Sequence, residues 1–424
     1  MRTRQRGVVM IVVLGILVGV LTGVAIYAAN QSDAVRTTAN RSEQRRARMA
    51  AEAGIQYALS YLQTIADSPQ DPVTLDGDWA TLGNDGADYF VIGNESFRLQ
   101  ILDNASFLDI NTIDEATLNN LPLTQEQIDS FLDWRGAGNT TARAEGAKDD
   151  YYNNLSKPYN AREGLFQTVN ELLMVRGWTP DTLYQIQSNT VNTGRTTNNN
   201  QPESPLSDIL GLSCYSATTD PDGNGKVNIN QQGLTDQQLS QRAQIPLQTA
   251  TAIINAKNAR ANQQFDRLSQ VIAVPGVQGN QQAIRGILDR MTTTAAPRIE
   301  GHVNINTAKA ETLSYIPGVT QDIANQIVDN RPTDGYQQLS DLLSVSGDTT
   351  FLGAVADSMT VNTQSFLVRV EGKAGRMTVA LEAVIAISNG APTVVRVEQP
   401  SFANMPDRWS WQDEANETTL LEKQ

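Results

Sequence analysis

The sequence contains only one cysteine and one histidine among its 424 residues. The single cysteine, Cys214, excludes an intramolecular disulfide framework, and we expect it to be a buried, inert, small apolar residue. The single histidine, His302, argues against a multi-histidine metal site, and we expect it at the surface or in a turn. Phosphate-binding loops, nucleophile elbows and zinc motifs are also absent from the sequence. These absences disfavour most enzymes that act in solution.

Basic residues are also few. The chain has 32 lysines and arginines against 46 acids, a net charge of −14. The first 29 residues hold three arginines and no acid, so the rest of the chain carries −17. Such a surface repels the phosphate backbone of nucleic acids. The remaining composition, 40% hydrophobic and 18% charged, is typical of a folded protein, and the length predicts two to four structural units.

The one long apolar run lies at the amino end. Residues 8–29 form an uncharged stretch that follows three arginines and Gly7. As a helix it would be about 33 Å long, enough to cross a membrane. The arginines favour a cytoplasmic N-terminus, with everything after Ala29 outside the inner membrane. A secretory signal peptide is the alternative, but it would have a shorter apolar region followed by a cleavage site.

The pattern continues as a helix beyond the membrane. Residues 30–66 contain no proline, and their apolar residues recur every three or four positions. We therefore expect one helix over 8–66. Gly15, Gly19 and Gly23 lie on one face of its apolar half and would let another helix approach closely. The alternative is that glycine is simply common in membrane helices.

The middle of the chain is a threefold repeat. Each copy opens with a short Asx-Ile-Asn segment, beginning at Asp109, Asn228 or Asn304, and continues to an apolar-proline pair. A helix follows, which ends near Arg135, Arg260 or Arg331. Six positions then recur at identical offsets, starting at Phe166, Phe265 and Tyr336 and ending in a glycine. Each copy therefore predicts two or more short helices with Asn or Thr at the N-cap.

Strand patterns flank the repeats. Phe97, Leu99 and Ile101 alternate within 96–102, and 366–371, 377–387 and 394–397 are also strand-like. Gly372 to Gly375 is expected to form the hairpin turn between the second and third of these. The tail after Pro400 is polar apart from Trp409 and Trp411, and we expect it to be loosely held. The fold class is therefore α+β, with a helical region inserted into a sheet.

An acidic loop precedes the second repeat. Asp220, Asp222 and Asn224 have the spacing of side-chain ligands in a calcium loop, and the carbonyl of Lys226 would follow. Asn228 would bind directly or through water. Gln231 stands where a bidentate glutamate is usual, so the predicted calcium site is weak. The alternative is an ordinary Asp/Asn/Gly turn.

The N-terminus resembles that of type IV pilin-like proteins. The resemblance implies cleavage by a prepilin peptidase between Gly7 and Val8, with Val8 methylated as the first mature residue. Most members have glutamate at the fifth mature position, where this chain has Val12. Its absence, together with the Gly146–Tyr152 segment, is similar to the minor pseudopilin K of type II secretion. That class implies a pilin-like fold, a long helix against an antiparallel sheet.

The repeats resemble helix-hairpin-helix units, a family that often binds DNA. Its members use a Gly-apolar-Gly hairpin whose amides meet phosphates. The third copy has Gly318-Val319-Thr320, without the second glycine, and the first copy, around Pro122, has none. Asp322 and Asp329 follow the third hairpin. We therefore expect an interaction scaffold and no binding of nucleic acid.

The expected organisation is a leader at 1–7, a transmembrane half-helix at 8–29, an extracytoplasmic half-helix at 30–66, β parts at 67–108 and 363–400, helical repeats at 109–195, 228–297 and 298–362, a connector at 196–227 and a tail at 401–424. The predicted function is that of a non-catalytic minor pseudopilin at or near the pseudopilus tip, promoting assembly and protein export. It would be a single-pass inner-membrane protein with most of its chain in the periplasm. Expected partners are the prepilin peptidase, other minor pseudopilins, the inner-membrane secretion platform and exported proteins. The alternatives are a minor pilin of a type IV pilus and a membrane-anchored receptor for DNA uptake.

Overall fold

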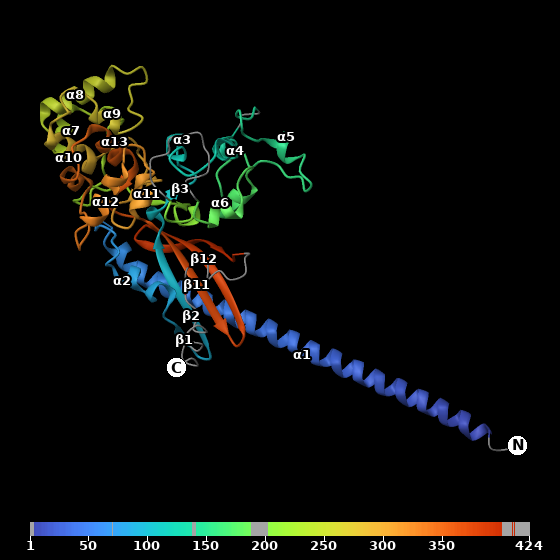
Figure 1. Ribbon diagram of the computed structural model, residues 1–424. Helices are drawn as coiled ribbons and strands as arrows, with labels where there is room; N and C mark the ends of the chain where they lie inside the picture. Colours follow the sequence, from blue (N-terminus) through green and yellow to red (C-terminus); the bar gives the residue numbers. More distant parts are fainter. Residues whose placement is uncertain are drawn as a thin grey trace.

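The computed structural model describes residues 4–69, 71–137, 141–187, 202–400, 409 and 411. It consists of one long helix, a sheet that packs on part of that helix, and a helical region at the end of the sheet (Figure 1). The long helix projects far from the globular part toward the N-terminus. The predicted α+β class is confirmed.

The first helix, α1 (Arg4–Asp67), runs unbroken for 64 residues, as the sequence predicts. Its C-terminal half is anchored on the sheet through small residues such as Ala47, Ala51 and Ala58, all of them fully buried. Its N-terminal half exposes large apolar side chains. The change from exposed apolar residues to buried alanines marks the point where the globular part begins.

The sheet has five antiparallel strands in the order β1 (Phe90–Ile92), β2 (Glu95–Asp103), β11 (Ser365–Ala374), β12 (Met377–Ser388) and β13 (Ala391–Glu398). The predicted alternation in β2 is confirmed, because Phe97, Leu99 and Ile101 are buried beside α1. The predicted hairpin turn is wrong by three residues. Gly372 pairs with Phe97 and Val379 inside the sheet, so the chain turns only after Ala374.

The helical region lies between β2 and β11 in the sequence. Two-residue strands open and close each repeat by parallel pairing: β3 (Leu108–Asp109) with β4 (Leu210–Gly211), β6 (Val227–Asn228) with β7 (Met291–Thr292), and β9 (Val303–Asn304) with β10 (Met359–Thr360). The first repeat therefore closes after residue 195, where the sequence placed its end. The helices between these strands are α3 (Glu115–Leu118), α4 (Gln125–Arg135), α5 (Asp149–Tyr152), η3 (Val169–Met174), α6 (Pro180–Tyr184), α7 (Asp236–Ala243), α8 (Leu247–Asn258), α9 (Ser269–Ile272), α10 (Gln281–Arg290), α11 (Ala310–Ser314), α12 (Gln321–Asp329), η5 (Leu339–Ser344) and α13 (Thr349–Ser358). The smaller elements are α2 (Asp78–Thr81), η1 (Asn84–Gly86), η2 (Asn104–Ser106), η4 (Leu206–Asp208), β5 (Tyr215–Ala217) and β8 (Arg298–Glu300).

One asparagine has the same role in each repeat. Its Oδ1 accepts a hydrogen bond from the backbone N–H of an aromatic residue, and its Nδ2 donates to the carbonyl of that residue. The pairs are Asn111 with Phe166, Asn230 with Phe265 and Asn306 with Tyr336, at 2.8–3.0 Å. This pair of bonds ties the two halves of each repeat together.

A basic side chain makes a second recurring contact. Arg135, Lys257 and Arg331 each donate to the carbonyl of the isoleucine in the opening segment of their repeat. In the second repeat this residue is Lys257, and Arg260 lies over the Phe265 ring at 4.5 Å. The repeats thus share an internal framework that the sequence pattern shows only in part.

The sheet and the helical region have separate apolar cores. A buried polar cluster joins them at Asp103, the last residue of β2. Its carboxylate accepts hydrogen bonds from the Ala105 amide, from Asn304 Nδ2 at 2.9 Å and from Thr307 Oγ1 at 2.6 Å. The third repeat is therefore held directly to the end of a central strand.

The expectation of a loosely held tail is wrong for its two tryptophans. Trp409 and Trp411 are 6% and 4% exposed. Their rings lie 5.7 Å from the Arg369 guanidinium and 5.1 Å from the Arg98 guanidinium. Both arginines alternate with residues that face α1, so the tryptophans cover the opposite face of the sheet. The rest of the tail lies outside the described residues.

Candidate functional site

The apolar half of α1 is the first candidate. Residues Met10–Tyr27 have a mean hydropathy of 2.6, and none of them is buried, so this segment is long and apolar enough to cross a membrane. Gly15, Gly19 and Gly23 have no other residue within 4 Å of a Cβ placed on them. The face on which they lie is open in this chain. Gly7 and Val8 belong to α1, but the structure does not describe their exposure.

The predicted calcium loop is a tight turn stabilised by Asp220. Asp220 Oδ1 accepts hydrogen bonds from the amides of Asp222 and Asn224, at 3.0 and 2.8 Å. Arg290, which ends α10, places Nη1 at 3.1 Å from Asp220 Oδ2 and at 2.6 Å from Asp222 Oδ2. The two carboxylates therefore converge on Arg290, a positive charge that comes from the second repeat.

The other predicted ligands lie differently. Lys226 is partly buried and donates from Nζ to the Leu288 carbonyl, and desolvation lowers its pKa. Asn228 Oδ1 accepts from the Asn230 amide, so this side chain serves the repeat, while Gln231 is exposed. Among the described residues no group of three His, Cys, Asp or Glu side chains could hold a metal ion. Calcium binding stays a prediction.

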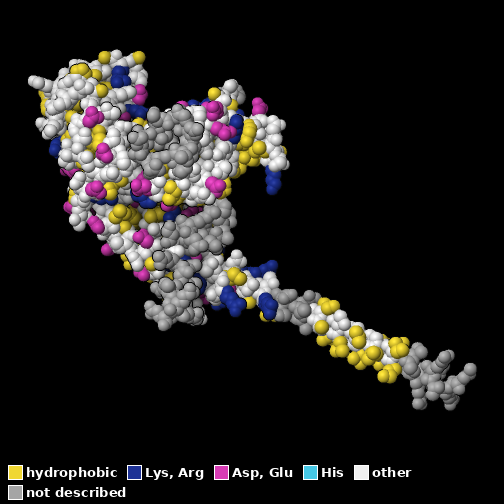
Figure 2. All heavy atoms as spheres, in the orientation of Figure 1, with side chains coloured by type: hydrophobic (Ala, Val, Ile, Leu, Met, Phe, Trp, Pro, Cys, Tyr) yellow, Lys and Arg dark blue, Asp and Glu magenta, His cyan; other side chains and the backbone are white. Residues whose placement is uncertain are grey.

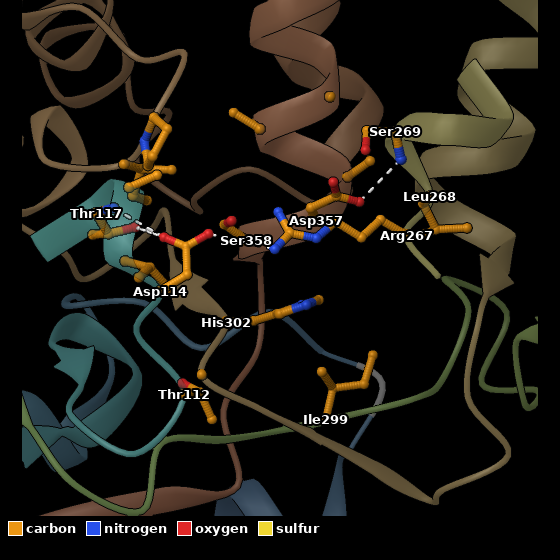
Figure 3. A pocket seen from close by; sticks show the side chains of 18 of the residues that line it. Thr112, Asp114, Thr117, Arg267, Leu268, Ser269, Ile299, His302, Asp357 and Ser358 are labelled. Atoms are coloured by element: carbon orange, nitrogen blue, oxygen red, sulfur yellow. Dashed lines mark hydrogen bonds and ion pairs between the residues drawn. The ribbon is translucent and has the colours of Figure 1, made fainter. Parts of the chain in front are cut away.

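A cleft of about 600 Å³ opens where the three repeats meet. Figure 3 shows Asp114 of the first repeat facing Arg267 of the second, a pair separated by 3.4 Å. Desolvation raises the pKa of Asp114, but hydrogen bonds from Thr117 and the charge of Arg267 outweigh it, so the net shift is downward. Asp357 of the third repeat accepts a hydrogen bond from the Ser269 amide of the second. An ion pair and a hydrogen bond between repeats therefore hold the walls of the cleft together.

His302 and Cys214 lie near this junction. His302 is partly buried at the cleft, where desolvation lowers its pKa to about 4 (Figure 3). It is therefore neutral at pH 7, and it lies in the two-residue connection between β8 and β9, in agreement with the expected turn position. Cys214 is fully buried, as predicted, and desolvation raises its thiol pKa. A buried thiol of this kind is a poor nucleophile.

The acidic segment of the first repeat is built around a buried lysine. Lys148 Nζ donates to the carbonyls of Asp133 and Gly136 at 2.7 and 2.9 Å, at the end of α4. Next to it, Asp149 accepts from the Ala161 amide and Tyr152 is fully buried. Lys148 thus neutralises the α4 terminus, and the sequence analysis missed this role. The sequence signal for this role is a lysine, Lys148, that directly precedes two aspartates.

The hairpin of the third repeat is closed on itself. The Val319 amide donates to the Ile316 carbonyl at 3.0 Å, so it is not free to bind a phosphate. Gly318 backs onto α13, where an added Cβ would lie 3.1 Å from the Thr350 carbonyl oxygen. This hairpin packs within the repeat.

Comparisons with known proteins agree with this architecture. Residues 115–190 match the family model described as type II secretion system protein K, and residues 299–348 match the helix-hairpin-helix motif. Among solved structures, a chain from the crystal structure of the GspK-GspI-GspJ complex of the enterotoxigenic Escherichia coli type 2 secretion system is similar. The similarity has a TM-score of 0.51 at 12% identity and covers 86% of this chain and all of that chain. No curated protein matches the sequence. The predicted resemblance to the protein K family, its helix-hairpin-helix part and the pilin-like fold are confirmed.

Proposed function

We propose that this chain is a non-catalytic minor pseudopilin of a type II secretion system, at or near the tip of the pseudopilus. One observation carries the proposal. The segment that matches protein K lies in the first helical repeat, and the repeats are inserted into a pilin-like helix and sheet. Its role would be to promote pseudopilus assembly and thereby protein export across the outer membrane.

The tip position is supported by Val12. Most pilin-like proteins have a glutamate there that pairs with the terminal amine of a neighbouring subunit. A carboxylate without such a neighbour would be costly in the membrane, and a tip subunit has no neighbour above it. Val12 avoids that cost, because an apolar side chain needs no polar partner in the hydrocarbon of the membrane.

The proposed partners are the prepilin peptidase, other minor pseudopilins, the inner-membrane platform and exported proteins. The similarity to a chain from the GspK-GspI-GspJ complex supports the minor pseudopilins among them. We also propose that the Asp220 loop binds calcium weakly, in exchange for its contacts with Arg290.

The orientation in the membrane is proposed from the family resemblance. Three arginines precede the span, but Arg36, Arg41, Arg45 and Arg46 follow it within 20 residues, so the arginine bias alone does not decide. A cysteine introduced at exposed Ser388 should react with a membrane-impermeant maleimide added outside the inner membrane. Protection of this cysteine until the membrane is opened would contradict a periplasmic location.

The function is tested by processing and by secretion together. Mass spectrometry of membrane-extracted protein should show a chain that begins at Val8. Deleting the gene should lower exported protein in the medium, and the wild-type gene should restore it, whereas Gly7→Leu should leave the leader uncut and fail to restore export. A mature chain that begins after Ala29, or export that is unaffected by the deletion, would reject the proposal.

A further inference from the structure

Two tryptophans cover the outer face of the sheet, the face opposite α1. On the side of the molecule seen in Figure 2, exposed apolar side chains gather on the membrane half of α1 and are scattered over the globular part, so exposure alone indicates no docking surface there. Trp409 and Trp411 have ring centroids 4.8 Å apart and form a small cluster with Ala380, separate from both large apolar cores. We call these two residues the tryptophan strap.

The surface beneath the tryptophan strap consists of ion pairs. Arg98 pairs with Glu371 at 3.0 Å, and Arg369 lies 3.5 Å from Glu382. Both pairs join residues that stand directly opposite each other on neighbouring strands, so they form without the strap. Burying an ion pair removes hydration that the attraction between the charges does not fully return. Release of the strap would restore that hydration and offset part of the cost of exposing the indole rings.

The tryptophan strap leaves polar groups on this face unsatisfied. Trp411 Nε1, Gln100 Oε1 and Arg369 Nε are buried and have no hydrogen-bond partner among the described residues. A buried polar group without a partner weakens the contact that buries it. Beside Trp409 lies a cavity of about 110 Å³, which reaches Tyr184 of the first repeat. Another occupant of this face could therefore make contacts that the strap does not make.

The contact surface of Trp411 is shaped for an aromatic ring. A Cβ on Gly86 would lie 2.2 Å from the indole ring, so only glycine leaves room for it. The Arg98 guanidinium lies 5.1 Å from the centre of the same ring, within the range of a cation–π contact. We call Gly86 and Arg98 the ring seat. The ring seat selects an aromatic side chain both by shape and by charge.

We propose that the outer face of the sheet is a docking site for an extended segment of a partner protein that carries two aromatic side chains two residues apart. The tryptophan strap occupies this site in cis and is removable. The spacing of the aromatic residues follows from the strap itself, since Trp409 and Trp411 both cover this face. A segment that also enters the cavity beside Trp409 would displace the strap. This inference goes beyond the proposed function and does not depend on it.

The first test supplies the strap in trans. A fluorescein-labelled peptide with the sequence of residues 405–414 is titrated with the full chain in neutral detergent, either wild type or W409A/W411A. Fluorescence anisotropy should show that the variant binds at least about tenfold more tightly, because the strap of the wild type is then open in at most about a tenth of the molecules. The same peptide with both tryptophans replaced by alanine should not bind. Equal affinities of wild type and variant would overturn the inference.

A matched pair of glycine variants tests the ring seat. In the W409A/W411A chain, Gly86→Ala fills the seat and should weaken peptide binding by a similar factor. Gly93→Ala is the control, because Gly93 also has a positive φ but its added Cβ would lie no closer than 3.7 Å to a neighbour, the Glu95 carboxylate. It should leave the affinity unchanged. Equal loss in the two variants would mean that backbone strain, and not the ring seat, controls binding.

A second measurement needs no substitution in the strap. In full-length wild type labelled with fluorotryptophan, excess unlabelled peptide should expose Trp409 and Trp411 to solvent, seen as a larger fluorine NMR shift between light and heavy water. Trp79, Trp134 and Trp178 belong to the large cores and should not respond. Strap signals that stay buried at saturating peptide, or a W409A/W411A chain that no longer unfolds cooperatively, would show that the strap is a fixed part of the fold. Dimerisation of the wild type through its tryptophans would make a second copy the occupant, and each of these results would overturn the inference.

Discussion

At the scale of single residues, the repeats depend on polar side chains that act in place of backbone. Asn306 is fully buried and bonds both the N–H and the carbonyl of Tyr336. A buried backbone group without a partner costs roughly 1–3 kcal/mol. Each asparagine therefore stabilises its repeat by satisfying two backbone groups at once.

Asn306→Ala should lower the free energy of unfolding by about 2–3 kcal/mol, since both groups of Tyr336 lose their partner. Urea unfolding followed by fluorescence measures the change. The control is Asn325→Ala, an exposed residue of α12 whose side chain accepts a hydrogen bond from Gln321, and it should shift stability by less than about 0.5 kcal/mol. Equal effects of the two substitutions would show that the Asn306 contacts are dispensable.

Asp103 makes stability depend on pH. Desolvation raises its pKa above the usual range, and hydrogen bonds from Thr307 and Asn304 offset only part of that. The folded state therefore binds this proton more tightly than the unfolded state, so the contribution is greatest below the unfolded pKa of about 3.9 and is lost as pH rises through the folded value. Wild type should gain stability relative to Asp103→Asn when the pH falls from 7 to 4.5. A pH-independent difference between their unfolding free energies would contradict this.

At the scale of elements, the contact between α1 and the sheet relies on two glycines. A Cβ at Gly372 would lie 2.0 Å from the Ala47 carbonyl oxygen, and a Cβ at Gly54 would lie 2.7 Å from a methyl of Val370. At these two positions the helix and the sheet therefore approach too closely for a Cβ atom. This contact fixes the position of α1, and with it the direction of the membrane half.

Gly372→Ala should destabilise the protein by about 1–3 kcal/mol, because the obstacle is helix backbone and one of the two elements must move. Gly347→Ala is the matched control, since nothing lies within 4 Å of its added Cβ and its φ is not positive. Thermal unfolding of both variants decides the point. Similar melting temperatures would mean that the helix adjusts at little cost.

The calcium loop can be tested through Arg290. If calcium displaces this guanidinium, Arg290→Gln should strengthen the calcium response, and Asp222→Ala should abolish it. With a dissociation constant of about 10⁻⁴–10⁻³ M, tenfold excess calcium adds roughly 1.4 kcal/mol to stability. Melts with calcium and with chelator measure the gain. An equal response in wild type and Asp222→Ala would mean that the loop is only a turn.

Much of this element structure follows from local pattern. The unbroken helix, the alternation in β2 and the three repeats can be read from spacing, because each signal lies within a few turns or strands. The contacts of Arg290 with Asp220 and of Trp411 with Arg98 cannot, since 70 and more than 300 residues separate the partners. The predicted hairpin turn is wrong because Gly372 is required by the close approach of α1 at Ala47, where a Cβ would not fit. It is not required by a turn.

At the scale of the whole molecule, the insertion decides how the parts are arranged. β2 and β11 are adjacent strands of one sheet, although the entire helical region separates them in sequence. The helical region is therefore attached to the sheet by both of its ends and by the Asp103 cluster. Any force on the repeats is passed to the sheet and to α1 on which it packs.

The same arrangement bears on whether the repeats bind DNA. The chain without its first 29 residues has a net charge of −17, the third hairpin uses its Val319 amide internally, and Asp322 follows it. We expect full-length protein in neutral detergent to bind a 30-base-pair duplex no tighter than about 10⁻⁴ M in 0.15 M salt, the weak end of non-specific affinity. Fluorescence anisotropy measures this directly.

If charge is the obstacle, D322K/D329K should bind more tightly than wild type and with a steeper salt dependence, because released counterions then favour the complex. Micromolar, salt-sensitive binding by the wild type would instead support a receptor for DNA uptake.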